Sequence, residues 1–170
     1  LADVLETPPE EERDSIGTEL DHVDGYLKFE GVSFRYGSDS SSPWIFRDLS
    51  FEIPAGQTLA LVGRSGSGKT TLGRLLMRLY SPQEGRILLD GVDIEQIGIG
   101  SLRRQMGTIL QETRLFNGTI RENIALGEVE VDEERLARAS QLALVSEFVQ
   151  KMPMGVESIV GERGMTCSGG

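Results

Sequence analysis

The chain has 170 residues, of which 38% are hydrophobic and 26% are charged, and it carries a net charge of −10. That length and composition fit a globular domain with a sizeable core and exclude a disordered tail, a collagen or a coiled coil. The apolar runs are strand-sized, well short of the roughly 18 residues that span a bilayer, and the single cysteine and single histidine exclude an internal disulfide and multi-histidine metal sites.

Acidic residues are concentrated at the N-terminus. Residues 1–25 hold nine acids and one base and so carry −8, whereas the remaining 145 residues carry only −2. Neither part offers the broad basic surface that nucleic-acid binding requires, so we expect no nucleic-acid partner. We interpret residues 1–24 as a solvated acidic linker in which His22 is exposed.

Two strands are predicted after this linker. Apolar residues alternate along residues 27–36 but change parity at Gly31, which predicts a strand with a bulge at that glycine. A second strand is predicted over residues 44–53, and the turn residues 54–56 close it. Two strands joined in this way favour an antiparallel sheet.

A strand, a glycine-rich loop and a helix are predicted next. Residues 58–62 form a short, continuous apolar run, which is typical of a strand buried on both faces of a parallel sheet. The loop covers residues 63–68. Leucines then recur at 72, 75, 76 and 79, the spacing of an amphipathic helix, and residues 80–82 end it.

The remaining pattern begins with four short elements and then becomes helical. The four are a strand over residues 86–89, an Asp90-Gly91 turn, a helix over residues 101–105 and a strand over residues 106–110. Thr119 and Glu122 fit a capping box that opens a helix, and Asp132 fits the cap of another. Beyond residue 119 the pattern indicates helices and no strand.

One motif carries the chemistry. It is the phosphate-binding P-loop, G-x-x-x-x-G-K-[ST], matched at every fixed position by Gly63, Arg64, Ser65, Gly66, Ser67, Gly68, Lys69 and Thr70. The glycines let backbone N–H groups surround phosphate oxygens, and the following helix adds its partial positive charge. Lys69 supplies a flexible cation for the β- and γ-phosphates, and the Thr70 hydroxyl is a hard oxygen ligand of the kind that magnesium prefers. Alone, the motif indicates only a nucleoside triphosphate.

Ordered motifs beyond the P-loop narrow the class. Residues 34–36 end in an aromatic ring 27 residues before Gly63, and Gln111 lies 42 residues after Lys69. The first resembles the A-loop and the second the Q-loop of an ABC transporter nucleotide-binding domain of the exporter type. Further along, residues 115–124 resemble the segment after the Q-loop of that domain, residues 160–164 its X-loop and residues 167–170 its signature. The resemblance covers residues 26–170. Residues 1–10 also resemble the linker of bacterial exporters, with peptide and bacteriocin exporters the nearest subfamily.

The resemblance implies a fold, ligands and partners. The implied fold is α/β, with an N-terminal antiparallel β subdomain and a P-loop NTPase core within residues 25–112, and an incomplete helical subdomain over residues 113–170. ATP and magnesium are the implied ligands, used to drive export across a membrane. The implied partners are a second nucleotide-binding domain, in a head-to-tail dimer, and the transmembrane domain of the same transporter, at the cytoplasmic face of a bacterial inner or cell membrane.

The resemblance also implies roles for single residues near the nucleotide. Tyr36 would stack on adenine, so that Tyr36→Phe would be nearly neutral; the alternative is core packing beside Phe34. Ile45 would touch the ribose or base, and Thr71 would bind nucleotide together with the P-loop. Gln111 would ligate magnesium with Thr70 and sense the γ-phosphate.

Two further sets of residues would act on partners. The X-loop residues that would couple to the transmembrane domain are Gly161, Glu162, Arg163 and Gly164, and the signature residues that would bind the partner's ATP are Ser168, Gly169 and Gly170. Cys167 stands where the family usually has leucine. The family's second magnesium-site aspartate, catalytic glutamate and switch histidine have no match here, so we expect a fragment, truncated within the signature, that binds ATP but is inactive alone. A soluble ABC-type ATPase and a non-hydrolysing nucleotide-binding regulatory module remain the alternatives.

Overall fold

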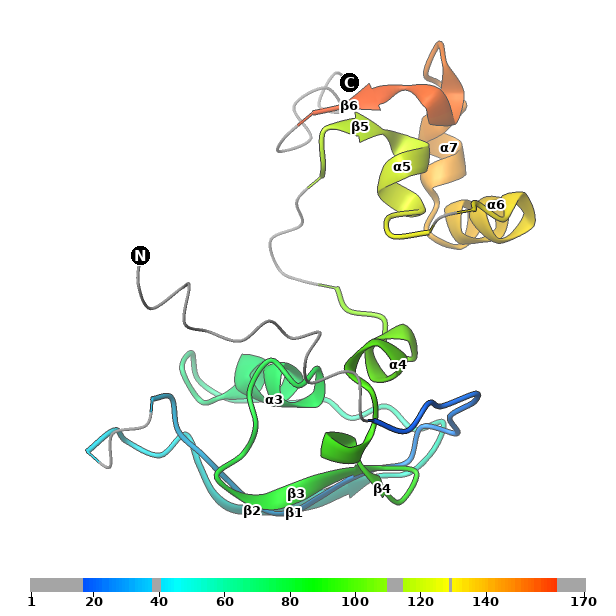
Figure 1. The fold of residues 1–170 in the computed structure, drawn as a ribbon. Coiled ribbons are helices and arrows are strands. Elements are labelled where there is room, and N and C mark those ends of the chain that lie inside the picture. Colours follow the sequence, from blue (N-terminus) through cyan, green and yellow to red (C-terminus); the bar gives the residue numbers. More distant parts are fainter. Residues whose placement is uncertain (1–16, 38–40, 110–114, 129, 162–170) are drawn as a thin grey trace, which may run out of the picture. The chain divides into compact units, whose positions relative to one another are not determined.

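The computed structural model describes residues 17–37, 41–109, 115–128 and 130–161. The chain divides into two compact units, Leu1–Thr108 and Ile109–Gly170, and each unit has its own hydrophobic core. Figure 1 shows the elements of both units in chain order.

The first unit is built on a four-stranded antiparallel sheet. Its strand order is β2-β1-β3-β4, so that the first strand of the chain is paired on both sides. The four strands are β1 (Leu27–Phe34), β2 (Phe46–Ile53), β3 (Glu84–Leu89) and β4 (Val92–Asp93). The predicted antiparallel pairing of the first two strands is confirmed.

A bulge interrupts β1 at the predicted place. The register with β2 shifts between the pairs Phe29↔Phe51 and Val32↔Leu49. Gly31 lies in this gap with a φ of 59°, in the left-handed region that glycine tolerates best. The bulge reverses the parity of the strand, so that Phe29 and Val32 are both buried in the same core.

Helices cover one face of this sheet and close the core (Figure 1). They are α3 (Lys69–Leu76), the 3₁₀ helix η1 (Ile94–Gln96) and α4 (Ile99–Arg104). Leucines 72 and 75 of α3 pack with residues of the two central strands and of α4. The buried residues of this core are Phe29, Val32, Phe34, Leu72, Leu75, Ile87, Leu89, Ile94, Ile97 and Leu102.

The helix α3 ends one turn earlier than predicted. Arg78 adopts a φ of 50°, and the N–H of Leu79 donates to the carbonyl of Arg74 at 2.9 Å. This bond, with the one from the Arg78 N–H to the Leu75 carbonyl at 3.0 Å, forms a Schellman motif. Leu79 therefore lies outside the helix and is 48% exposed, which corrects its assignment to the buried face.

Residues 18–26, which precede β1, are bound along the first unit. Thr18 forms a parallel bridge with Ile97, and the Leu20 N–H donates to the buried Ser101 hydroxyl at 2.8 Å. Further along, the Asp90 carboxylate accepts three backbone N–H groups, from residues 24, 25 and 26. His22 is exposed, as predicted, and its ring lies 3.5 Å from the Asp24 carboxylate.

Two predicted strands are absent from the part of the chain that the structure describes. Residues 58–62 lie outside any strand, with Leu59 and Leu61 each 46% exposed and Val62 96% exposed. The described part of the 106–110 segment is also outside any strand, and Ile109 is 96% exposed. Neither run finds a strand partner among the described residues, and an apolar run without a partner stays open to solvent.

The second unit is mainly helical. Its elements are β5 (Gly118–Thr119), α5 (Ile120–Ile124), α6 (Glu133–Leu142), α7 (Val145–Val149), η2 (Gly155–Glu157) and β6 (Ile159–Val160). Ile120, Val149 and Val160 form its buried core. The expectation of no strand beyond residue 119 was wrong, because β6 pairs antiparallel with β5 through Gly118↔Val160 and Thr119↔Ile159.

Candidate functional site

The P-loop joins an irregular segment to the first turn of α3. Gly66 and Gly68 have φ values of 81° and 91°, which turn the backbone in a way that L side chains rarely allow. Gly68 also lies against β2: a Cβ there would come within 2.6 Å of the Phe46 ring and 2.9 Å of the Ile45 side chain. The loop therefore takes its path because these positions carry no side chain.

The Lys69 ammonium group lies over the loop. Its Nζ donates to the carbonyls of Gly63 and Arg64, each at 2.8 Å, and to the Ser67 hydroxyl at 3.2 Å. A compact cation thus lies beside a turn built from the same residues. The predicted P-loop residues are brought together around one positive charge.

The N-terminus of α3 adds a second positive feature. Gly68 is its N-cap and provides no side-chain hydrogen bond, and the first intrahelical bond runs from the Leu72 N–H to the Gly68 carbonyl. The N–H groups of residues 69–71 therefore have no acceptor within the helix, which is the arrangement that binds anions. Thr70, in the first turn, is exposed.

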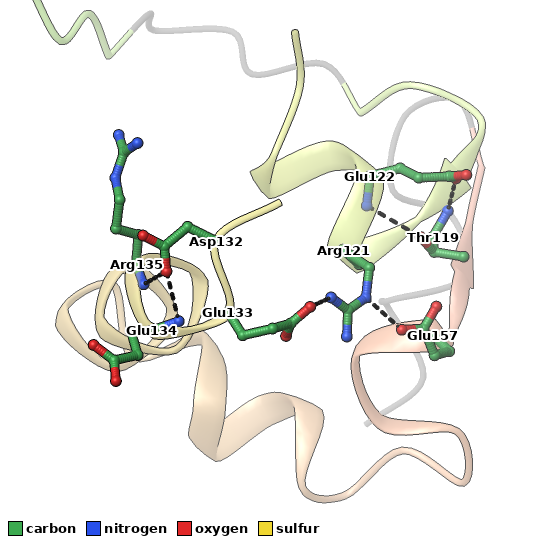
Figure 2. Close-up of polar contacts among 8 residues, drawn as sticks. All are labelled: Thr119, Arg121, Glu122, Asp132, Glu133, Glu134, Arg135 and Glu157. Carbon is green, nitrogen blue, oxygen red and sulfur yellow. Dashed lines mark hydrogen bonds and ion pairs between the residues drawn. The ribbon is translucent and has the colours of Figure 1, made fainter. Parts of the chain in front are cut away.

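Two helices of the second unit satisfy their first turns differently. Thr119 and Glu122 form the predicted capping box of α5, and the Asp132 carboxylate accepts the N–H groups of residues 134 and 135 in α6. Figure 2 shows both caps. Side-chain oxygens occupy in these helices the position that an anion would occupy at α3.

Tyr36 is attached to α3 by its hydroxyl group. The hydroxyl lies 3.0 Å from the Thr71 Oγ1 and accepts a hydrogen bond from Arg74 Nη1 at 3.1 Å. The ring packs edge-on against Phe34 and Tyr80, with centroids 5.0 and 5.1 Å apart. The hydrogen bond to Tyr36 raises the pKa of Arg74 above its already high ordinary value. Sequence reasoning missed Arg74, whose only signal is that it follows Thr71 by three residues in a helix.

Ile45 and Trp44 lie on the strand side of the loop. The Ile45 N–H donates to the Phe34 carbonyl at 2.8 Å, and its side chain packs toward Gly68. The neighbouring Trp44 ring has the guanidinium of Arg35 4.6 Å from its centroid and that of Arg47 5.8 Å away. Ile45 is therefore next to the P-loop, as a nucleotide-contacting residue must be, whereas the Trp44 ring is engaged by arginines.

An ion-pair network in the second unit was not predicted. Arg121 of α5 donates to Glu157 at 2.5 Å and also to Glu133, so one guanidinium joins α5, α6 and η2 (Figure 2). The bonds to Glu157 and then Glu133 raise the pKa of Arg121. The sequence shows only that these three charged residues lie near helix ends. It does not identify Glu133 and Glu157, 12 and 36 residues after Arg121, as partners of this arginine.

Several predicted site residues lie outside the described part of the chain. They are Gln111, Glu162, Arg163, Gly164, Ser168, Gly169 and Gly170. Gly161 follows β6 directly and is described. Among the described residues, no cluster of three or more His, Cys, Asp or Glu side chains is arranged to hold a metal ion, and no helix is long and apolar enough to cross a membrane.

The chain is similar to proteins of one family. The ABC transporter family profile matches residues 46–170. The chain is 41% identical over its full length to the ATP-dependent lipid A-core flippase of Chromohalobacter salexigens, covering 29% of that protein. It is 46% identical over 88% of its length to the mitochondrial iron-sulfur clusters transporter of Aspergillus fumigatus, covering 20% of that protein.

A solved structure shares the fold. The structure of a bacterial Atm1-family ABC exporter with ATP bound matches 91% of this chain and 27% of its own, with a TM-score of 0.79 and 39% identity. The chain thus spans less than a third of the length of these relatives. The family match over residues 46–170 and the P-loop geometry agree, and the chain belongs to the ABC transporter family and has the fold of its ATP-binding domain.

Proposed function

We propose that this chain is the ATP-binding part of an ABC exporter, in which ATP binding and hydrolysis drive movement of a substrate across a membrane. The observation that carries the proposal is the P-loop, where the Lys69 ammonium and the uncapped N-terminus of α3 converge. Two positive features at one turn suit the β- and γ-phosphates of a nucleoside triphosphate. The names of the relatives, a flippase and a transporter among them, support the exporter assignment.

The proposed cofactor is magnesium, and the described residues fit it. Thr70 is exposed at the first turn of α3 and offers one hard oxygen. Magnesium is held in nucleotide sites by one or two protein oxygens together with phosphates and waters, so a single hydroxyl is compatible with it. Gln111 is the second proposed ligand. The ion would neutralise phosphate charge, while Lys69 and the α3 amides would bind and orient the phosphates.

The proposed partners follow from the same assignment. A second ATP-binding domain would meet this one head to tail, with the signature residues Ser168, Gly169 and Gly170 facing the partner's ATP. The transmembrane domain of the transporter would contact residues 161–164. The chain would then lie at the cytoplasmic face of the membrane, with residues 1–24 as the connection to the transmembrane domain.

The decisive experiment compares two lysine substitutions. Lys69→Ala removes the ammonium group that lies over the loop, and a hydrogen bond to a charged group contributes roughly 1.5–3 kcal/mol. We therefore expect ATP affinity, measured by calorimetry on the purified chain, to fall at least about tenfold. Lys151→Ala, which removes an exposed lysine of the second unit, is the matched control and should bind ATP normally. Unchanged affinity in Lys69→Ala, with an unchanged melt, would contradict the proposal.

A further inference from the structure

The hydroxyl group of Tyr36 forms hydrogen bonds with two side chains of α3. Arg74 has only donors, so the Tyr36 oxygen accepts from its guanidinium. The phenolic proton is then available to Thr71, whose Oγ1 lies 3.0 Å away. Thr71 and Arg74 are three residues apart and share one face of α3. The chain of hydrogen bonds runs from Arg74 through Tyr36 to Thr71.

This chain of bonds joins an aromatic ring to the P-loop helix. Thr71 is only 6% exposed and lies two residues after Lys69, so the attachment point is buried in α3 and next to the loop. Phe34 and Tyr80 contact the ring from two directions, with interplanar angles of 83° and 86°. Edge contacts restrict the tilt of the ring, and the hydroxyl bonds restrict its remaining freedom.

We propose that the Tyr36 hydroxyl is a positioning group, which sets the distance and orientation of the aromatic ring relative to the P-loop before a nucleotide binds. This inference rests on the proposed function and deepens it, because it concerns how one site receives both a base and a triphosphate. A ligand that contacts both the Tyr36 ring and the P-loop binds at a lower cost in conformational freedom when the ring and the loop are already correctly placed relative to each other. If only the ring contributed to binding, Tyr36→Phe would leave ATP affinity unchanged. The contacts of the hydroxyl predict instead that this substitution lowers ATP affinity.

The test separates base binding from phosphate binding. ATP contacts both the ring and the loop, whereas inorganic tripolyphosphate contacts only the loop. Tyr36→Phe keeps the ring and removes both hydrogen bonds of the hydroxyl. Because these bonds would act on the nucleotide only through the position of the ring, ATP affinity should fall about two- to tenfold, the contribution of a typical intramolecular hydrogen bond. The affinity for tripolyphosphate should stay within twofold of wild type. Calorimetry on the purified chain gives both constants.

Two further comparisons make the test specific. Tyr26→Phe is the matched control, because the Tyr26 hydroxyl also donates to a side chain, Glu52 at 2.6 Å, but on the sheet rather than on α3; it should leave both affinities unchanged. Arg74→Met removes the other end of the hydrogen-bond chain. It should weaken ATP binding less in the Tyr36→Phe background than in wild type, because the coupling is already lost. Any general effect of its charge on phosphates is present in both backgrounds and cancels.

The affinities of the variants for ATP and tripolyphosphate decide between the positioning role and its alternatives. A selective loss of ATP affinity in Tyr36→Phe, with coupling to Arg74, supports the positioning role. Wild-type ATP affinity in Tyr36→Phe, together with loss of ATP binding in Lys69→Ala, would overturn this role and leave the proposed function intact. Equal loss of ATP and tripolyphosphate would show that the hydroxyl supports the loop itself and would also overturn it. Retention of both ligands by Lys69→Ala would instead overturn the proposed function.

Discussion

The packing of Gly68 against β2 predicts a large and specific cost for one methyl group. Gly68→Ala would place an L residue at a φ of 91°, a conformation that costs about 1–2 kcal/mol. Its Cβ would lie 2.6 and 2.7 Å from two carbons of the Phe46 ring, and overpacking of this kind costs about 1–3 kcal/mol. The free energy of unfolding of the first unit should therefore fall by about 2–5 kcal/mol.

Two other glycines serve as graded controls. Gly66 has a φ of 81° but open space around its Cβ position, so Gly66→Ala should show only the conformational cost of about 1–2 kcal/mol. Gly73 lies inside α3, also with open space and without a positive φ. Gly73→Ala should therefore stabilise the unit by about 0.5–1 kcal/mol through helix propensity.

The assay is urea unfolding followed by the fluorescence of Trp44, the single tryptophan of the chain. Trp44 lies two residues before Phe46, close to the predicted clash, and reports on the first unit. ATP affinity, measured in parallel, should fall in Gly68→Ala because the loop must move away from the ring. Equal midpoints for the Gly66 and Gly68 variants would refute the steric part of the argument. If Gly73→Ala lowers the free energy of unfolding, the conclusion that a Cβ at position 73 of α3 has open space around it would be wrong.

Two further predictions concern the first unit. Asp90→Ala removes the acceptor of three backbone N–H groups and should lower the free energy of unfolding by about 1–3 kcal/mol. The control, Asp21→Ala, removes an exposed carboxylate and should change the free energy of unfolding by less than about 0.5 kcal/mol. Hydrogen bonds from Lys28 and then Arg86 lower the pKa of Glu30 below its ordinary value of 4.5. The ionised carboxylate therefore stabilises the fold above pH 4.5, and this contribution is lost as the pH falls through the lowered pKa of the folded state. The melting temperature of Glu30→Gln should accordingly lie below that of wild type at pH 7 and approach it at pH 3. A difference in melting temperature that does not change with pH, or an equal difference for the control Glu84→Gln, would contradict the role of the ion pairs.

Features set by neighbouring residues could be predicted from the sequence. The capping box of Thr119 and Glu122 and the cap at Asp132 depend on side chains within three residues of the backbone groups they satisfy. The parity change at Gly31 located the bulge in β1 for the same reason. Local chemistry of this kind acts before tertiary packing is known and needs no distant partner.

Features set by distant or unusual residues could not be predicted. The pair β5–β6 joins two-residue strands about 40 positions apart, and two residues are too few to show an alternating pattern. The end of α3 depends on Arg78 in a left-handed conformation, where sequence reasoning expects glycine. The Tyr36–Thr71 contact spans 35 positions, and no periodicity relates its two residues.

The apolar run at residues 58–62 shows which information was missing for the P-loop. The run predicted a strand buried on both faces, but an apolar pattern does not identify what would bury it, and Val62 is 96% exposed. The described loop is instead held from its other end, where Gly68 packs on Phe46 of β2 and on Ile45 just before that strand, and α3 is bonded to Tyr36. The position of Lys69 therefore depends on the sheet and the helix, so substitutions at Phe46 should disturb phosphate binding more than substitutions at the exposed Val62.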